Sequence, residues 1–131
     1  MNESTRLMRV IAWCIATPMV LFLLLAGGTK ILGMNPLSNI ETLSGWVFWI
    51  GLGEVTAGIL FFLPRTCILG ALALSAHLGG AILFHMIRGE SFFAPSIFIS
   101  FWFQSTLLLA TWLVVGLRYP AIISNAGYQS A

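Results

Sequence analysis

Long apolar runs alternate with short polar segments along almost the whole chain. A connection over 31–42 follows the first run, Leu63–Thr66 separates the second from the third, and Arg88–Ser91 separates the third from the fourth. Because a helix needs about 20 apolar residues to cross a bilayer, each run is long enough to do so. The pattern predicts four helices, over about 8–28, 40–63, 66–87 and 95–117.

Composition sets the class of protein. Of the 131 residues, 59% are hydrophobic and 8% are charged, whereas a soluble domain carries about 25% charged residues. We therefore expect an all-α integral membrane protein, a four-helix transmembrane bundle in contact with the lipid bilayer. The helices occupy nearly all of 1–131, which leaves a single transmembrane domain. The net charge of +2 and the lack of a basic stripe argue against a nucleic-acid partner.

Positive charges predict the orientation of the bundle, because Lys and Arg collect on the cytoplasmic side of a membrane. Four arginines fall on one side of the predicted spans, and two basic residues fall on the other. The first side carries Arg6, Arg9, Arg65 and Arg118, and the second carries Lys30 and Arg88. This distribution favours both termini in the cytoplasm. A signal peptide is the other interpretation of the first run, but no small-x-small cleavage site follows it.

The connection before the second helix contains a helix start signal. Ser38-Asn39-Ile40-Glu41 matches a capping box, in which the Ser and Glu side chains satisfy each other's free backbone donors. The second helix is therefore predicted to begin near Ser38 and to stop at Leu63, before Pro64.

Two polar residues stand inside the second and third runs. Glu54 and His77 lie at nearly equal distances from the turn at Arg65, so a tight antiparallel hairpin places both at a depth of roughly 15 Å, near the bilayer midplane. Ionisable groups at this depth are costly and are functional candidates by default. Small residues allow helices to approach closely in lipid. Those predicted to form the helix contacts are Gly51, Gly58, Gly70, Gly80 and Ala81.

A second polar tier is expected nearer the outer surface. Lys30 ends the first helix, and His85 and Arg88 end the third, so the three could form a basic collar. A ligand with an anionic or quinone-like head could bridge this collar and Glu54. Whether Glu54 pairs with His77 or with His85 stays open. The structural alternatives are a protonated, hydrogen-bonded Glu54, a satisfied core His77 and solvated basic residues at the interface.

The residue inventory argues against several chemistries. A metal site needs three or four convergent ligands, and both histidines lie on one predicted helix, so we predict neither a metal site nor an intrinsic cofactor. Phosphate-loop, dinucleotide and nucleophile-elbow motifs do not occur in the sequence. Cys14 and Cys67 are far apart and are read as apolar fillers. No complete catalytic site emerges, which favours a protein that is not itself an enzyme.

With these residues in hand, the chain resembles the DoxX-like family of small four-helix bacterial membrane proteins. The resemblance covers most of the chain from Ala26 to Pro95, and His77 is not part of its pattern. The matching positions are Gly27, Lys30, Gly53, Glu54, Gly58, Pro64, Arg65, Gly70, Ala71, Ala81, His85, Arg88 and Gly89.

The resemblance implies a multi-pass protein of the bacterial inner membrane. Related proteins include membrane subunits of redox assemblies, among them a thiosulfate:quinone oxidoreductase, and proteins linked to oxidative-stress complexes. Lys30, Glu54 and His85 carry over as the polar positions, quinone as a candidate ligand, and membrane oxidoreductase subunits as candidate partners. Without a cysteine pair, the chain gives no support to thiol chemistry.

Three functional hypotheses follow. In the first, the protein is an accessory subunit of a quinone-linked redox system, with Glu54 exchanging protons or binding a quinone oxygen. In the second, it is a small proton-coupled transporter, which would need a homo-oligomer and would use Glu54 and His77 as a relay. In the third, it is a scaffold that stabilises a larger membrane complex.

Overall fold

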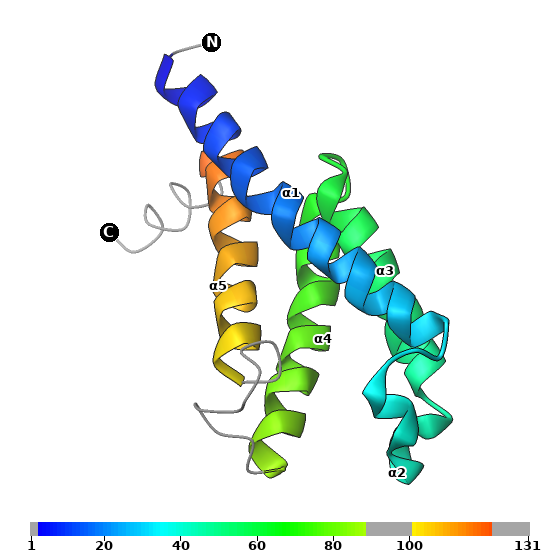
Figure 1. The fold of residues 1–131 in the computed structure, drawn as a ribbon. Helices are drawn as coiled ribbons and strands as arrows, with labels where there is room; N and C mark the ends of the chain where they lie inside the picture. Colours follow the sequence, from blue (N-terminus) through cyan, green and yellow to red (C-terminus); the bar gives the residue numbers. More distant parts are fainter. Residues whose placement is uncertain (1–2, 89–100, 122–131) are drawn as a thin grey trace.

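The computed structural model describes residues 3–88 and 101–121, and every regular element in them is helical (Figure 1). The predicted all-α class is therefore confirmed. The elements are α1 (Glu3–Ile31), η1 (Pro36–Asn39), α2 (Glu41–Ser44), α3 (Val47–Phe62), α4 (Cys67–Ile87) and α5 (Phe101–Arg118).

The observed bounds differ from the predicted ones mainly around the first connection. α1 begins five residues before the predicted start and continues to Ile31, with Pro18 inside it. The predicted helix over 40–63 is divided into the single turn of α2 and the longer α3, while α4 nearly matches 66–87. The predicted fourth helix corresponds to α5, and its first part, 95–100, lies outside the described residues.

The predicted capping box does not form. Ser38 lies in η1, and its hydroxyl donates to the backbone oxygen of Asn35 over 2.6 Å. Asn35 is the residue that caps a helix, because its side-chain oxygen accepts from the backbone N–H of Leu37 and Pro36 follows it at the first helical position. The side-chain cap in this connection therefore belongs to η1, whereas α2 begins at Glu41 with no side-chain cap.

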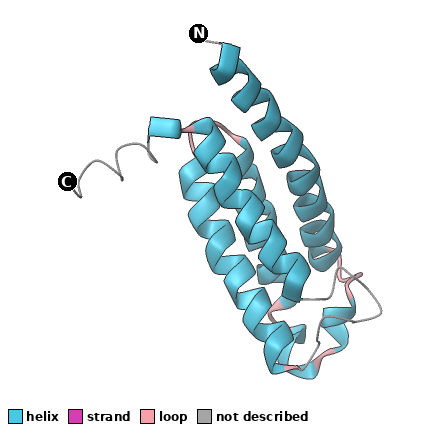
Figure 2. Cartoon of the chain, turned by 90° about the vertical axis from the view of Figure 1, so that its left-hand side faces the viewer, coloured by secondary structure: helices cyan, strands magenta, loops and turns pink. Residues whose placement is uncertain are grey.

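The described residues form four long helices, and Figures 1 and 2 show how they are arranged. α1 packs along α3, α4 packs along α5, and α3 and α4 form an antiparallel hairpin (Figures 1 and 2). The start of α1, the α3–α4 turn and the end of α5 lie at one end of the molecule (Figure 1). We call this the turn end. α2 and the end of α4 lie at the other end, which we call the α2 end.

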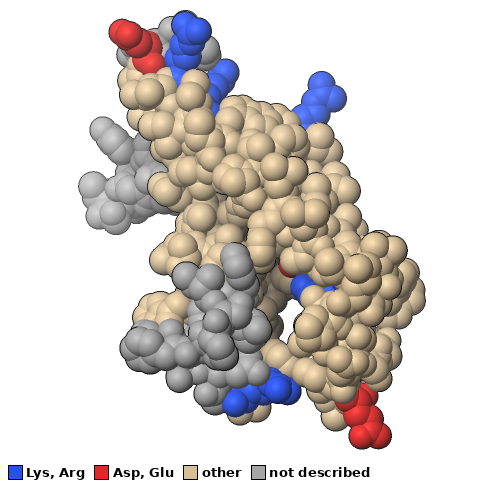
Figure 3. All heavy atoms as spheres, in the orientation of Figure 1, with Lys and Arg blue, Asp and Glu red and all other residues tan. Residues whose placement is uncertain are grey.

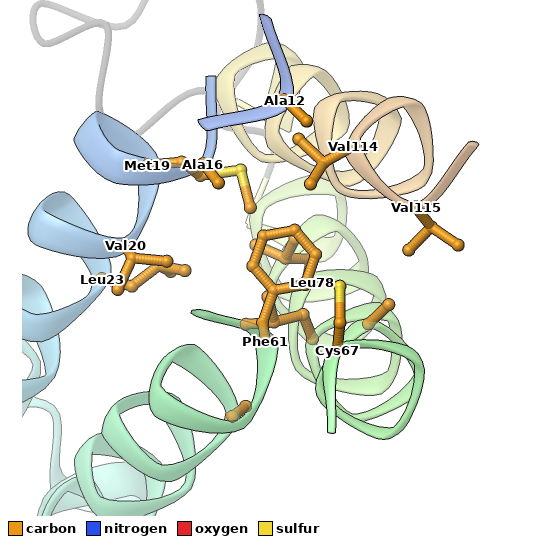
Figure 4. Close-up of a cluster of buried hydrophobic side chains, with 13 residues drawn as sticks. Ala12, Ala16, Met19, Val20, Leu23, Phe61, Cys67, Leu78, Val114 and Val115 are labelled. Atoms are coloured by element: carbon orange, nitrogen blue, oxygen red, sulfur yellow. The ribbon is translucent and has the colours of Figure 1, made fainter. Parts of the chain in front are cut away.

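The core lies between the helices toward the turn end and consists of apolar side chains from α1, α3, α4 and α5 (Figure 4). Phe61 fills its centre, and the two alanines Ala12 and Ala16 keep α1 close to its neighbours. Large apolar side chains also cover the outer surface, among them Leu25, Trp49 and Leu109. A chain that is apolar on its outside as well as in its core suits a hydrocarbon solvent better than water.

Two segments, Glu3–Asn39 and Cys67–Ile87, each contain a helix that is long and apolar enough to cross a membrane, judged by length and composition. The apolar α3 is shorter, at 16 residues.

Glycines at two crossings bring helix backbones into direct contact. A Cβ at Gly51 would lie 2.6 Å from the backbone oxygen of Gly27, and a Cβ at Gly70 would lie 2.1 Å from the backbone nitrogen of Phe61. A Cβ at Gly58 would make an ordinary contact, 3.7 Å from Cβ of Leu23. These positions hold α1 against α3 and α3 against α4, as small residues do between helices in lipid.

Gly80 corrects the prediction of small contact residues. It is exposed, and a Cβ built on it meets no described atom within 4 Å. Ala81, by contrast, is half-buried. Gly70 contacts the backbone of α3 at Phe61, close to the turn of the hairpin. Among the described residues, this close contact does not extend along α4 as far as Gly80.

Arg118, at the end of α5, contacts the three other long helices at the turn end. Its Nη1 donates to the backbone oxygen of Phe61 over 3.0 Å and lies 3.4 Å from the sulfur of Cys67. Its guanidinium carbon lies 4.4 Å from the ring centre of Trp13 in α1. A positive charge at the end of α3 is favoured by the helix dipole. The neighbouring Tyr119 hydroxyl donates to the backbone oxygen of Pro64.

Replacing Gly70 by alanine should destabilise the protein, because the new methyl group would collide with the backbone of α3. Overpacking of this kind costs about 1–3 kcal/mol. Gly80→Ala is the matched control on the same helix, and it should leave stability unchanged or raise it by up to about 1 kcal/mol through helix propensity. Thermal unfolding followed by circular dichroism measures both. Equal melting temperatures for the two variants would contradict the close contact at Gly70.

Candidate functional site

Glu54 is a buried carboxylate in the middle of α3, with 3% of the residue exposed. The buried positions of α3 recur at helical spacing, and Glu54 falls on the same face as Gly51 and Gly58. The face that carries the apolar contacts of α3 therefore also carries its only acidic residue. A carboxylate in such a place requires hydrogen bonds or a counter-charge.

Lys30, in the last turn of α1, supplies the counter-charge. Its Nζ donates to Oε2 of Glu54 and forms an ion pair with it. Gly51 makes this contact sterically feasible, because a Cβ there would lie 2.7 Å from Cβ of Lys30. Helical side chains lean toward the start of their own helix, so the long Lys30 side chain reaches back along α1 to the level of Glu54.

His77 approaches the other carboxylate oxygen from α4. Its Nε2 lies 3.8 Å from Oε1 of Glu54, which is beyond the range of a direct hydrogen bond. One carboxylate thus brings together groups from α1, α3 and α4. We refer to Lys30, Glu54 and His77 as the polar cluster.

The polar cluster is mostly enclosed but not sealed. The exposed fractions of the side chains are 12% for Lys30, 5% for Glu54 and 19% for His77. Figure 3 shows most of the charged atoms at the two ends of the molecule. It also shows a few acidic and basic atoms together in the middle, at the edge of a hollow in otherwise uncharged surface. A small molecule could therefore reach these groups.

The structure brings together some of the predicted polar residues and separates others. The equal depth of Glu54 and His77 corresponds to the observed approach of the two side chains. Lys30, which was predicted to lie in a basic collar with His85 and Arg88, forms an ion pair with Glu54. The described contacts of His85 and Arg88 are with Phe84, whose ring centre lies 5.7 Å from that of His85 and 5.4 Å from the Arg88 guanidinium carbon.

The Lys30–Glu54 pair was missed, although the sequence carries a trace of it. Each charged residue stands three positions after a glycine, Gly27 in one case and Gly51 in the other, and these two glycines meet where the helices touch. The equal spacing of Lys30 and Glu54 after these two glycines is the signal that could have indicated the pair.

Two apolar grooves lie apart from the polar cluster. The larger has a volume of about 370 Å³ and lies between α1 and α5, with Phe22 and Phe103 among its walls. The smaller, of about 190 Å³, lies between α1 and α3. Their walls suit hydrocarbon chains and hold no ionisable group.

The polar cluster can donate and accept hydrogen bonds and can move a proton between a carboxylate and an imidazole. Within 3–88 and 101–121, no three His, Cys, Asp or Glu side chains converge as a metal site would require, and both cysteines are free thiols.

Comparison with known proteins gave no match to a family model, to a curated protein or to a solved structure.

Removing the amine of Lys30 should destabilise the protein strongly, because Glu54 would keep a buried charge without its partner. Breaking a buried ion pair in this way costs about 3–5 kcal/mol. We expect Lys30→Met to show this loss in unfolding by a denaturing detergent, and Lys30→Met combined with Glu54→Leu to recover most of it. Glu41→Gln, in exposed α2, is the control for loss of a charge. If Lys30→Met were as stable as the wild type, the ion pair would have no structural importance.

Proposed function

We propose that this chain is a four-helix protein of the bacterial inner membrane that serves as an accessory subunit of a quinone-linked redox system. The observation that carries the proposal is the polar cluster, an ion pair and an imidazole held together in a molecule that is apolar both inside and out. Ionisable groups are retained in such surroundings mainly where function needs them. The DoxX-like sequence motifs supply the redox context.

The arrangement of the charges supports the membrane topology in this proposal. Arg6, Arg9 and Arg65 belong to the turn end, and Arg118 is held there by its contacts with α3. Arg88 follows α4 at the α2 end. With α1, α3, α4 and α5 as spans, the turn end faces the cytoplasm and both termini lie on that side.

Each residue of the polar cluster has a chemical role in this proposal. Lys30 can donate a hydrogen bond to an oxygen of a bound ring, Glu54 can take up or release a proton, and His77 can pass that proton along α4. A quinone bound here would supply the electron and proton acceptor. Under this proposal the electron donor belongs to a partner oxidoreductase.

Purification in a gentle detergent tests the proposal directly. We expect the tagged wild type to retain an oxidoreductase partner and extractable quinone, both identified by mass spectrometry. Glu54→Gln should lower the content of the quinone couple about tenfold or more, because the hydroxyl of its reduced form can donate to the carboxylate and a hydrogen bond to a charged group contributes about 1.5–3 kcal/mol. Glu41→Gln, which removes an exposed carboxylate, should retain both. A stable wild-type homo-oligomer with neither quinone nor partner would contradict the proposal, and a partner retained equally by all variants would favour a scaffold.

A second candidate function, proton-coupled transport by an oligomer, is favoured by one distance. The 3.8 Å between Nε2 of His77 and Oε1 of Glu54 can be bridged by one water or closed by a small side-chain movement, as a proton relay requires.

Liposomes with an imposed pH gradient separate this candidate from the first. If the chain transports protons, flux should disappear in Glu54→Gln and in His77→Ala. His85→Ala should keep its flux, because the described ring contact of His85 is with Phe84 rather than with Glu54. A wild type without flux above that of empty liposomes would eliminate transport.

A further inference from the structure

The hydrogen bonds of the polar cluster are incomplete among the described residues. Oε2 of Glu54 accepts from Lys30, whereas Oε1 has only the Nε2 of His77 nearby, at 3.8 Å. The described hydrogen bonds use one of the three N–H groups of Lys30 and neither nitrogen of His77. These unfilled positions lie in mostly enclosed, apolar surroundings, where hydrogen bonds to a bound molecule are favourable, so they define what a ligand can offer.

A molecule that fills both positions must donate and accept. Oε1 of Glu54 is a carboxylate oxygen and can only accept a hydrogen bond, while Lys30 has only N–H groups to offer. A hydroxyl group satisfies both, because it donates one hydrogen bond and accepts others. A carbonyl or an ether oxygen satisfies Lys30 but leaves Oε1 without a donor.

The charge of the cluster argues for a neutral molecule. Lys30 and Glu54 compensate each other within one ion pair. An added anion or cation would therefore bring an uncompensated charge into a mostly enclosed site, which is costly. The uncharged described surface beside the polar cluster favours an apolar body on the same molecule.

We propose that the polar cluster binds a neutral, lipophilic molecule through a hydroxyl group, of the alcohol, phenol or hydroquinone class. This rests on the proposed function in one respect: within a quinone couple, it selects the reduced, hydroxyl-bearing form. The hydroxyl donates to Oε1 of Glu54 and accepts from Lys30, and His77 lies beside it.

Three matched probes test this inference in lipid nanodiscs at neutral pH. They share a nonyl chain and a benzene ring: 4-nonylphenol donates and accepts, its methyl ether only accepts, and 4-nonylbenzoate is an anion. The readout is the imidazole ¹⁵N resonances of histidine-labelled protein. His85→Gln assigns the signals of His77 and leaves the polar cluster intact.

We expect the phenol to shift the His77 resonances at a concentration in the bilayer at least tenfold lower than either other probe. Glu54→Gln should weaken the phenol about tenfold, since the hydrogen bond loses its charged acceptor. An ether that binds as tightly as the phenol would show that apolar contact alone drives binding. A benzoate that binds as tightly would show a cationic site, and no shift with any probe would show that the cluster is satisfied by water. Each of these outcomes overturns the proposal.

The two proposals fail separately. Phenol-selective binding without a copurified oxidoreductase would keep the hydroxyl site and remove the redox role. A redox partner with no selectivity among the probes would keep the redox role and remove the hydroxyl site.

Discussion

The rest of this structure depends on how an apolar bundle accommodates a buried carboxylate. Glu54 faces the interior because it shares the contact face of α3 with Gly51 and Gly58. Its charge is tolerable only because Lys30 reaches it from α1. That contact in turn requires the helices to touch at Gly27 and Gly51, where any side chain would hold them apart. The close packing of α1 against α3 and the compensation of the Glu54 charge therefore depend on each other.

The two halves of the hairpin serve different purposes. Near the turn, Gly70 lies against Phe61 and Arg118 bonds to the backbone at the end of α3, which fixes α3, α4 and α5 relative to one another. About half-way along the hairpin, Glu54 of α3 faces His77 of α4, and the closest polar atoms of the two side chains are 3.8 Å apart. The contacts at the turn end position the helices that carry the polar cluster, and the unfilled hydrogen-bond positions of that cluster are the basis of both proposals.

Both proposals use the same chemical property of the cluster, namely that opposite charges are neutralised while hydrogen-bonding capacity remains. A site of this kind binds through directed hydrogen bonds rather than through net charge. It therefore suits a lipophilic molecule with one polar group, which can arrive from the hydrocarbon and need not carry a counter-ion with it. The apolar outer surface of the helices agrees with such a route.

The sequence by itself determined the helical class, the approximate extent of α4, and the equal depth of Glu54 and His77. The last was predictable because the short turn at Pro64 fixes the register of the hairpin, so counting residues from the turn gives equal depth. Only the tertiary structure decided that Lys30 pairs with Glu54, that a side chain at Gly80 would meet none of the described atoms, and that Asn35 rather than Ser38 caps the first turn after α1. A long connection fixes neither the register nor the rotation of the helices it joins. The contact between α1 and α3 therefore follows from packing at Gly27 and Gly51, and the sequence shows it only indirectly, in the equal spacing of Lys30 and Glu54 after these glycines.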